Sequence, residues 1–183
     1  MYTTDNDFVI DPNSRDTFER TRLHYTVRIG NFNATRSLLN AGADVNAIDV
    51  FGSTPLSIAC IDKPSPAMVR LLLEHNADVN LERPGTIDLL LECVLNCTTP
   101  LQANIINILI RHGKNINATD ALSNRSCMHM VAMTGYIPVA ESLLKMGGIV
   151  NIRDNFDYTP MKIANMHEHF ETLKLMQCYN RLV

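Results

Sequence analysis

Aspartates beside glycines are the first candidates for chemistry in this chain. Asp44 and Asp49 lie in the segment 42–59, GADVNAIDVFGSTPLSIA, and Asp78 lies in a similar segment farther along. Carboxylates in such loops can act as general acids or bases, or bind a metal ion. Asp44 and Asp78, however, occupy the same place in two similar segments, where an Asp side chain can hydrogen-bond to turn backbone. We therefore interpret these carboxylates as turn-forming groups.

Histidine and cysteine offer a second kind of chemistry, metal binding. His167 and His169 with Cys178 could form one zinc set, and Cys93 lies one helical turn from Cys97. Neither set has the paired spacing of a structural zinc site, so we predict no metal and no cofactor. The cysteines are odd in number and lie mostly in apolar, helix-like runs, which predicts buried reduced thiols; they are Cys60, Cys93, Cys97, Cys127 and Cys178.

Known catalytic motifs are the third possibility. Phe51-Gly52 after Asp49-Val50 has only a superficial likeness to the kinase Asp-Phe-Gly, because no glycine-rich loop or His-Arg-Asp run accompanies it. No Gly-x-Ser-x-Gly elbow is present, and no Lys-Ser/Thr follows Gly147-Gly148 as in a phosphate loop. We expect neither an enzyme nor a small-molecule substrate.

Composition points to a folded chain that binds neither nucleic acid nor membrane. The 183 residues are 46% hydrophobic and 19% charged, with a net charge of −3. No two Lys or Arg are adjacent, which disfavours a phosphate-tracking surface. The strongly apolar runs are far shorter than the roughly 20 residues of a membrane-spanning helix. The N-terminal segment lacks a basic and apolar signal pattern, so we expect a location in the cytoplasm or nucleus.

The elements that position these residues follow an internal repeat. Asn46, Asn80, Asn117 and Asn151 are separated by 34, 37 and 34 positions. An apolar helical segment precedes each asparagine and ends in a residue suited to a left-handed cap; these residues are Gly42, Asn76, Gly113 and Gly147. Thr-Pro steps at 54–55 and 159–160 predict the starts of further helices, because Thr caps and Pro fits the first helical position.

These segments resemble the ankyrin repeat family. DVFGSTPLSIA (49–59) and LLNAGADVNA (38–47) match its pattern closely, and RSCMHMVAMTG (125–135) and DNFDYTPMKIA (154–164) match in part. The resemblance covers about Thr17 to Met176 and implies an all-α solenoid of about five helix–turn–helix units with hairpin loops.

The unit boundaries follow from the repeat. We expect an N-terminal leader over 1–15 and an ankyrin repeat domain over 16–183, with units at about 16–48, 49–82, 83–119, 120–153 and 154–183. The third unit departs most, because DLLLECVLNC stands where a Thr-Pro-Leu-His helix is expected. Extra residues in the second and fourth units are predicted to fall in turns. The apolar last helix is either a cap with Cys178 buried or a contact surface.

The resemblance also implies where function lies. His24 and His129 stand at the histidine position of the family, where the ring ties one hairpin to the next. Partner contacts are implied for hairpin tips and for an exposed row on the first helix of each unit. The candidate residues are Val50, Phe51, Ser53, Ile61, Asp62, Arg83, Arg125, Met133, Asn155, Phe156 and Tyr158. Phe51 and Phe156 stand at equivalent tips; they either contact the partner or staple neighbouring hairpins.

We therefore expect a non-enzymatic protein–protein interaction module whose partner is another protein. The specific hypothesis is a regulatory subunit of a larger complex such as a cell-cycle protein kinase. The alternative is an adaptor or masking protein for a transcription factor or a ubiquitin-ligase substrate. Both hypotheses rest on the family resemblance and not on a residue motif.

Overall fold

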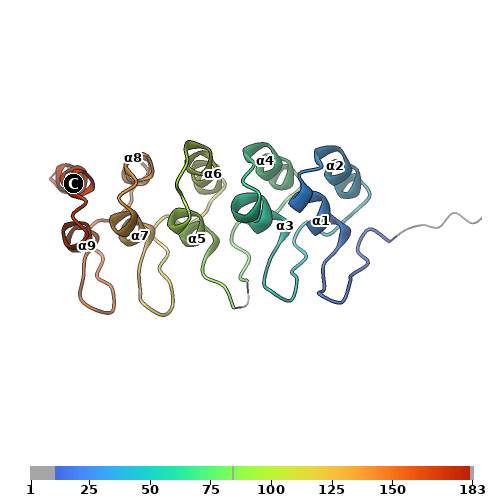
Figure 1. Cartoon of the computed structure of the whole chain (residues 1–183), viewed down its shortest axis with the longest axis horizontal. Coiled ribbons are helices and arrows are strands. Elements are labelled where there is room, and N and C mark those ends of the chain that lie inside the picture. Colours follow the sequence, from blue (N-terminus) through green and yellow to red (C-terminus); the bar gives the residue numbers. More distant parts are fainter. Residues whose placement is uncertain (1–10, 84, 182–183) are drawn as a thin grey trace, which may run out of the picture.

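The chain forms two parallel rows of helices in a computed structural model that describes residues 11–83 and 85–181 (Figure 1). The inner row comprises α1 (Arg22–Ile29), α3 (Pro55–Ser57) with its π-helical continuation η1 (Ile58–Asp62), α5 (Leu89–Leu95), α7 (Cys127–Thr134) and α9 (Pro160–Met166). The outer row comprises α2 (Phe32–Asn40), α4 (Pro66–Glu74), α6 (Pro100–Arg111), α8 (Ile137–Lys145) and α10 (Phe170–Asn180). The described residues form no strand, so the predicted all-α solenoid is confirmed.

Local capping explains where the helices begin and end. Thr54 Oγ1 accepts a hydrogen bond from Ser57 N at 3.0 Å, and Thr159 Oγ1 accepts one from Lys162 N at 3.3 Å. A proline follows each threonine at the first helical position, as predicted. The predicted stop residues all have positive φ, between 64° and 93°; they are Gly42, Asn76, Gly113 and Gly147. The units are therefore delimited by signals within the local sequence.

The core is a continuous apolar layer between the helices. Inner helices pack on their neighbours in the row, and each unit's two helices pack on each other. Leu72, Leu90, Ile106 and Leu143 are fully buried in this layer. Because each unit contacts its neighbours only, the repeat fixes the positions of the hairpins that project from it.

The extra residues are accommodated in two different ways. In the second unit the extra residue widens the inner helix into a π turn, with Lys63 N donating to Ile58 O at 2.9 Å. The prediction that this residue falls in a turn between helices is therefore wrong, because a single insertion can also be absorbed within a helix. In the fourth unit the extra residue does lie in the hairpin, where Asn124 takes a φ of 57°.

The repeat pattern starts before residue 16, the predicted boundary of the domain. Asn13 Oδ1 accepts a hydrogen bond from Asp44 N at 2.7 Å, and Asn13 Nδ2 donates to Gly42 O at 3.2 Å. Asn46 makes the corresponding bonds to Asp78 N and Asn76 O in the next turn. Residues 11–15 thus supply the asparagine turn that precedes the first complete unit, whereas most of the predicted leader lies outside the described residues.

The last helix packs by one side only. Met176 and Thr172 of α10 are buried, while Phe170 is 61% exposed. Cys178 is exposed, so the prediction of a buried thiol is wrong there and correct for the other four cysteines. The reason is geometric, because a residue two positions after buried Met176 lies roughly 200° around the helix, on the side away from α8 and α9.

Candidate protein-binding surface

Five hairpin loops project from the same side of the inner row (Figure 1). We number them along the chain: hairpin 1 is 15–21, hairpin 2 is 48–54, hairpin 3 is 82–88, hairpin 4 is 119–126 and hairpin 5 is 153–159. Each hairpin ends at the cap of an inner helix. Antiparallel bridges close hairpin 1 between Arg15 and Thr21, and hairpin 4 between Thr119 and Ser126.

An aspartate at the start of a hairpin holds the loop in shape. Asp49 Oδ1 accepts hydrogen bonds from Phe51 N at 2.9 Å and Ser53 N at 2.8 Å. Asp154 Oδ1 accepts the equivalent bonds from Phe156 N and Tyr158 N, both at 2.9 Å. Burial raises the pKa of both carboxyls, but these N–H donors and a nearby arginine outweigh burial and hold each pKa below its ordinary value. Both groups are structural anions.

The carboxylates of the repeat-end turns are also structural, as the sequence indicated. Asp44 Oδ1 accepts a hydrogen bond from Asn46 N at 2.9 Å, and Asp78 Oδ1 accepts one from Asn80 N at 2.8 Å. Each side chain thus holds its own turn two residues on, which confirms the interpretation of Asp44 and Asp78 as turn-forming residues.

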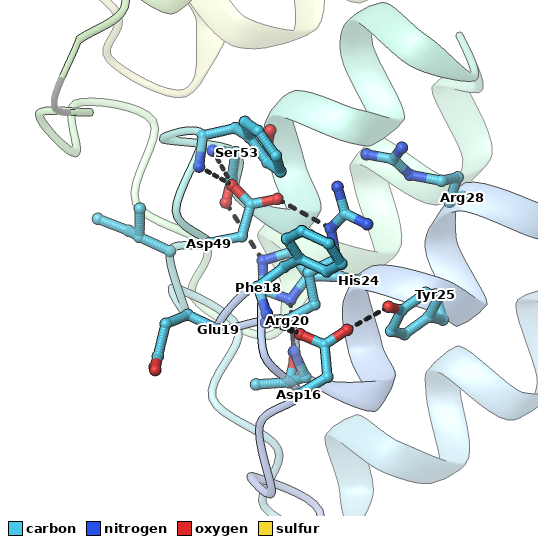
Figure 2. Close-up of polar contacts among 12 residues, drawn as sticks. Asp16, Phe18, Glu19, Arg20, His24, Tyr25, Arg28, Asp49 and Ser53 are labelled. Atoms are coloured by element: carbon cyan, nitrogen blue, oxygen red, sulfur yellow. Dashed lines mark hydrogen bonds and ion pairs between the residues drawn. The ribbon is translucent and has the colours of Figure 1, made fainter.

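An arginine joins hairpin 1 to hairpin 2 (Figure 2). Arg20 Nε lies 3.2 Å from Asp49 Oδ2, and the Asp49 side chain is fully buried. The Arg20 guanidinium lies 5.2 Å from the ring centroid of Phe18 and 5.3 Å from that of Phe51. The two rings stack on each other at 6.0 Å. Phe51 therefore does staple hairpins, yet it remains 58% exposed and Phe18 47% exposed.

The same arrangement joins hairpin 4 to hairpin 5. Arg125 Nε lies 2.9 Å from Asp154 Oδ2, whose side chain is again fully buried. The Arg125 guanidinium lies 5.8 Å from the ring centroid of Phe156, and its Nη1 lies 3.7 Å from Met133 Sδ. Phe156 is 63% exposed. A charged pair thus orders an exposed aromatic side chain at both ends of the array.

Large apolar side chains recur two positions after the hairpin aspartate. We call these residues the apolar tip row: Phe18, Phe51, Leu122 and Phe156. Leu122 is 89% exposed, the highest value among the exposed large hydrophobic residues described. Sequence reasoning found Phe51 and Phe156 but missed Phe18 and Leu122. The spacing Asp16-x-Phe18 and Asp120-x-Leu122 was the signal that could have found them.

The remaining predicted contact residues divide by exposure. Val50, Asn155 and Asp62 are exposed, and Asp62 forms an ion pair of 2.9 Å with Arg28 of the inner row. The half-buried members are Ser53, Ile61, Arg125, Met133 and Tyr158. Their contact with a partner stays a prediction.

Arg83 differs from the other predicted tip residues. Its side chain is 5% exposed, and its Nη2 lies 2.6 Å from Glu92 Oε2 and donates to Ile87 O at 2.9 Å. Arg83 takes the place of the aspartate in hairpin 3 and ties that hairpin to α5. Its guanidinium therefore lies in the hairpin interior, and its contact with a partner stays a prediction.

Two buried histidines connect the same hairpins that the arginines connect. His24 Nδ1 accepts from Thr21 N at 3.1 Å, and its Nε2 lies 3.2 Å from Ser53 O of hairpin 2. His129 bonds in the same way to Ser126 N and to Tyr158 O of hairpin 5. These contacts require the neutral ring with the proton on Nε2. The tie implied by the family resemblance is confirmed, so neither ring is a catalytic base.

The described residues offer little for catalysis or metal binding. Burial raises the pKa of the thiols of Cys60 and Cys127, which disfavours reactive thiolates there. Over residues 11–83 and 85–181 no three His, Cys, Asp or Glu side chains are arranged to hold a metal ion. Within the same residues no helix has the length and apolar character needed to cross a membrane.

Comparison with known proteins agrees with this architecture. A family model described as ankyrin repeats (3 copies) matches residues 6–83 and 89–181. The chain belongs to the ankyrin repeat family. Members of this family are in general protein–protein interaction modules and not enzymes. The chain is therefore a protein–protein interaction module.

Individual relatives cover most of this chain but little of their own length. Human neurogenic locus notch homolog protein 1 is 30% identical over 154 residues, which is 83% of this chain and 6% of that protein. The Gallus gallus nuclear factor NF-kappa-B p105 subunit is 28% identical over 157 residues, 83% of this chain and 15% of that protein. The Mus musculus B-cell lymphoma 3 protein homolog is 24% identical over 189 residues, 85% of this chain and 42% of that protein. The chain thus spans less than half the length of each of these relatives.

Proposed function

We propose that this chain is a non-enzymatic regulatory subunit that binds another protein across the apolar tip row and the adjoining inner helices. One observation carries the proposal: four large apolar side chains stand at equivalent hairpin positions and are 47% to 89% exposed. Solvated hairpins have no need of such residues, and exposed aromatic side chains beside arginines are the residues that anchor protein interfaces.

Order in the hairpins supports the proposal further. The backbone beside Phe51 and Phe156 is fixed by aspartate hydrogen bonds, and the rings rest on arginines that are themselves paired. A partner that meets these rings therefore loses little affinity to ordering them. The hairpin backbone and the two aromatic rings are therefore already ordered before a partner binds.

Two partner classes follow from the sequence and the comparisons. The family resemblance favours a protein kinase complex, and this partner remains a prediction. The likeness to the NF-kappa-B p105 subunit, named as a nuclear factor, favours a transcription factor as the second candidate. A cytoplasmic or nuclear location is part of the same proposal.

Affinity purification of the tagged chain from its own cell type, followed by titration of the recovered partner, tests this function. The double variant Phe51→Ala, Phe156→Ala should lose at least about tenfold in affinity, because it removes two exposed anchors. Leu101→Ala is the matched control, since Leu101 is 47% exposed on the outer row. Equal affinity of the double variant and the wild type would overturn the proposal. Recovery of a kinase or of a transcription factor decides between the two partner classes.

A further inference from the structure

The residue before each inner-helix cap differs in type along the array. It is arginine in hairpins 1 and 4, and the next hairpin supplies the aspartate that pairs with it. In hairpin 3 this residue is Ile87, directly before the cap residue Asp88. Hairpin 4 nevertheless has the receiving aspartate, Asp120. Asp49 and Asp154 each pair with an arginine of the preceding hairpin, whereas Asp120 faces a hairpin that has Ile87 at that position.

A groove lies where that arginine would be. It has a volume of about 560 Å³, and its lining includes Leu81, Glu82, Ile87, Asp120, Ala121 and Leu122. Hairpins 1 and 2 are joined by a backbone hydrogen bond from Val50 N to Phe18 O, and hairpins 4 and 5 by one from Asn155 N to Ser123 O. Among the described residues no such bond joins hairpin 3 to hairpin 4. The groove thus lies between two hairpins that lack the backbone bond found between hairpins 1 and 2 and between hairpins 4 and 5.

The groove carries uncompensated negative charge. Neither Asp120 nor Glu82 forms an ion pair with another described residue. The neighbouring cations are already committed, because Arg83 pairs with Glu92 at 2.6 Å and Lys114 pairs with Asp88 at 2.6 Å. A cation brought into the groove therefore meets carboxylates that have no partner charge.

The hydrogen bonds of Asp120 satisfy its oxygens without neutralising it. Oδ1 accepts from Leu122 N at 3.0 Å and Ser123 N at 2.7 Å. Oδ2 accepts from Arg125 N at 2.9 Å and from the Ser123 hydroxyl. Oδ2 is the oxygen that binds guanidinium in Asp49 and Asp154. A serine hydroxyl rotates freely, so an incoming guanidinium can replace it at Oδ2.

We propose that the groove between hairpins 3 and 4 receives an arginine side chain of the partner protein, which forms at Asp120 the ion pair that hairpins 1 and 2, and hairpins 4 and 5, make internally. The inference rests on the proposed function and names the chemistry of the partner. The guanidinium binds Asp120, and its faces pack on Ile87 and Leu122 as Arg20 and Arg125 pack on phenylalanine rings. Lysine fits less well, because its ammonium is compact, strongly hydrated and without a planar face.

Amide NMR with N-acetyl-L-arginine amide as the probe tests the site. We expect saturable shifts of the Leu122, Ser123 and Arg125 amides with a weak Kd on the order of 10–100 mM, the range that charge-assisted hydrogen bonds to one carboxylate support. N-acetyl-L-citrulline amide, the neutral isostere, should cause no saturable shift. Equal shifts with both probes would overturn the inference.

Two variants locate the binding. Asp120→Asn keeps an oxygen for the Leu122 and Ser123 N–H groups, loses the acceptor of Arg125 N and removes the charge, so the arginine probe should no longer saturate. Ile87→Arg places a guanidinium at the position of Arg20 and Arg125, so it should block the probe and raise the melting temperature. Unchanged probe binding in either folded variant would contradict the site. A chain that shows no probe binding but still loses its partner through Phe51→Ala, Phe156→Ala overturns this inference alone.

Discussion

His24 and His129 show how a single side chain can serve both folding and pH response. Each ring is buried and links its own helix cap to the next hairpin through both nitrogens. Burial lowers the pKa of each ring despite carbonyl and carboxylate groups nearby. Protonation would place a proton on Nδ1, where backbone N–H groups of Thr21 and Ser126 already point. The fold therefore requires the neutral rings.

The free energy of unfolding should fall as pH drops below about 6.5. The folded rings have a pKa below 6.5 whereas the unfolded rings titrate near it, so the unfolded state binds more protons between the two values. Stability is fully present above 6.5 and is lost as pH falls through the folded pKa. Urea unfolding at several pH values between 5 and 7.5 measures this slope.

The double variant His24→Gln, His129→Gln is the control for this slope. It should be less stable at pH 7.5, and its stability should change less between pH 7.5 and 5. The hairpin aspartates do not interfere, because their pKa values lie below 3.8 and they titrate only in stronger acid. A slope that persists in the double variant would assign the effect to other groups.

The role of a residue could be predicted from the sequence where the same residue type occupies the same position in more than one repeat. Asp44, His24 and His129 could be assigned from the sequence because their neighbours in the repeat constrain them. Arg83 could not, since it replaces an aspartate and its direction depends on Glu92, nine positions away on α5. Leu122 was missed because one extra residue separates it from the following helix cap, although its spacing from Asp120 is the same as at the other tips.

At the scale of elements, asparagine turns join successive units. Asn46 receives a hydrogen bond from Asp78 N at 2.8 Å, and Asn117 receives one from Ile149 N at 3.0 Å and donates to Gly147 O at 3.2 Å. Asn151 follows the last of these turns and instead donates to the Asn180 side chain at 2.7 Å. Asparagine at this repeat position therefore makes different hydrogen bonds, and contributes differently to stability, in different units.

Asn117→Ala should destabilise the chain by about 1 kcal/mol, because it removes two hydrogen bonds to backbone groups of the next turn. Asn151→Ala is the matched control and should change stability by less than about 0.5 kcal/mol, since only an exposed side-chain contact is lost. Urea midpoints and m-values of both variants measure the difference. An equal loss for both would mean that the turn bonds to the next unit are not what stabilises the array.

Helix starts and stops were predictable because capping depends on a few adjacent residues. The π turn at 58–62 was not, because an inserted residue can enter a helix or the loop after it. Asp62, at the end of this turn, forms an exposed ion pair of 2.9 Å with Arg28, a contact that no single-unit pattern contains.

At the scale of the whole molecule, the described residues join hairpin 1 to hairpin 2 and hairpin 4 to hairpin 5, and none of them bonds hairpin 3 to a neighbouring hairpin. Hairpins 1 and 2, and hairpins 4 and 5, are joined by an arginine–aspartate pair 29 positions apart in sequence, by a histidine tie and by a backbone bond. Residue 84, at the place of Val50 and Asn155, is a proline and has no N–H for such a bond. Hairpin 3 lacks these contacts because the residue types at the pairing positions differ between units. The repeat period alone does not show this difference.

This difference should appear in native-state amide exchange. Opening hairpin 3 breaks its charged pair with α5, between Arg83 and Glu92, but no described bond to a neighbouring hairpin. Opening hairpin 2 or 5 breaks a charged pair and, in addition, a histidine bond and a backbone bond to the neighbouring hairpin, each worth about 1 kcal/mol. Peptides covering 81–88 should therefore exchange about tenfold faster or more than those covering 48–54 and 153–159, since 1.4 kcal/mol corresponds to a factor of ten. Arg125→Ala should speed exchange in hairpin 5 but not in hairpin 2, because each unit contacts its neighbours only. Uniform exchange over all five hairpins would show that the helices alone, and not the ties between tips, set the rigidity of the binding surface.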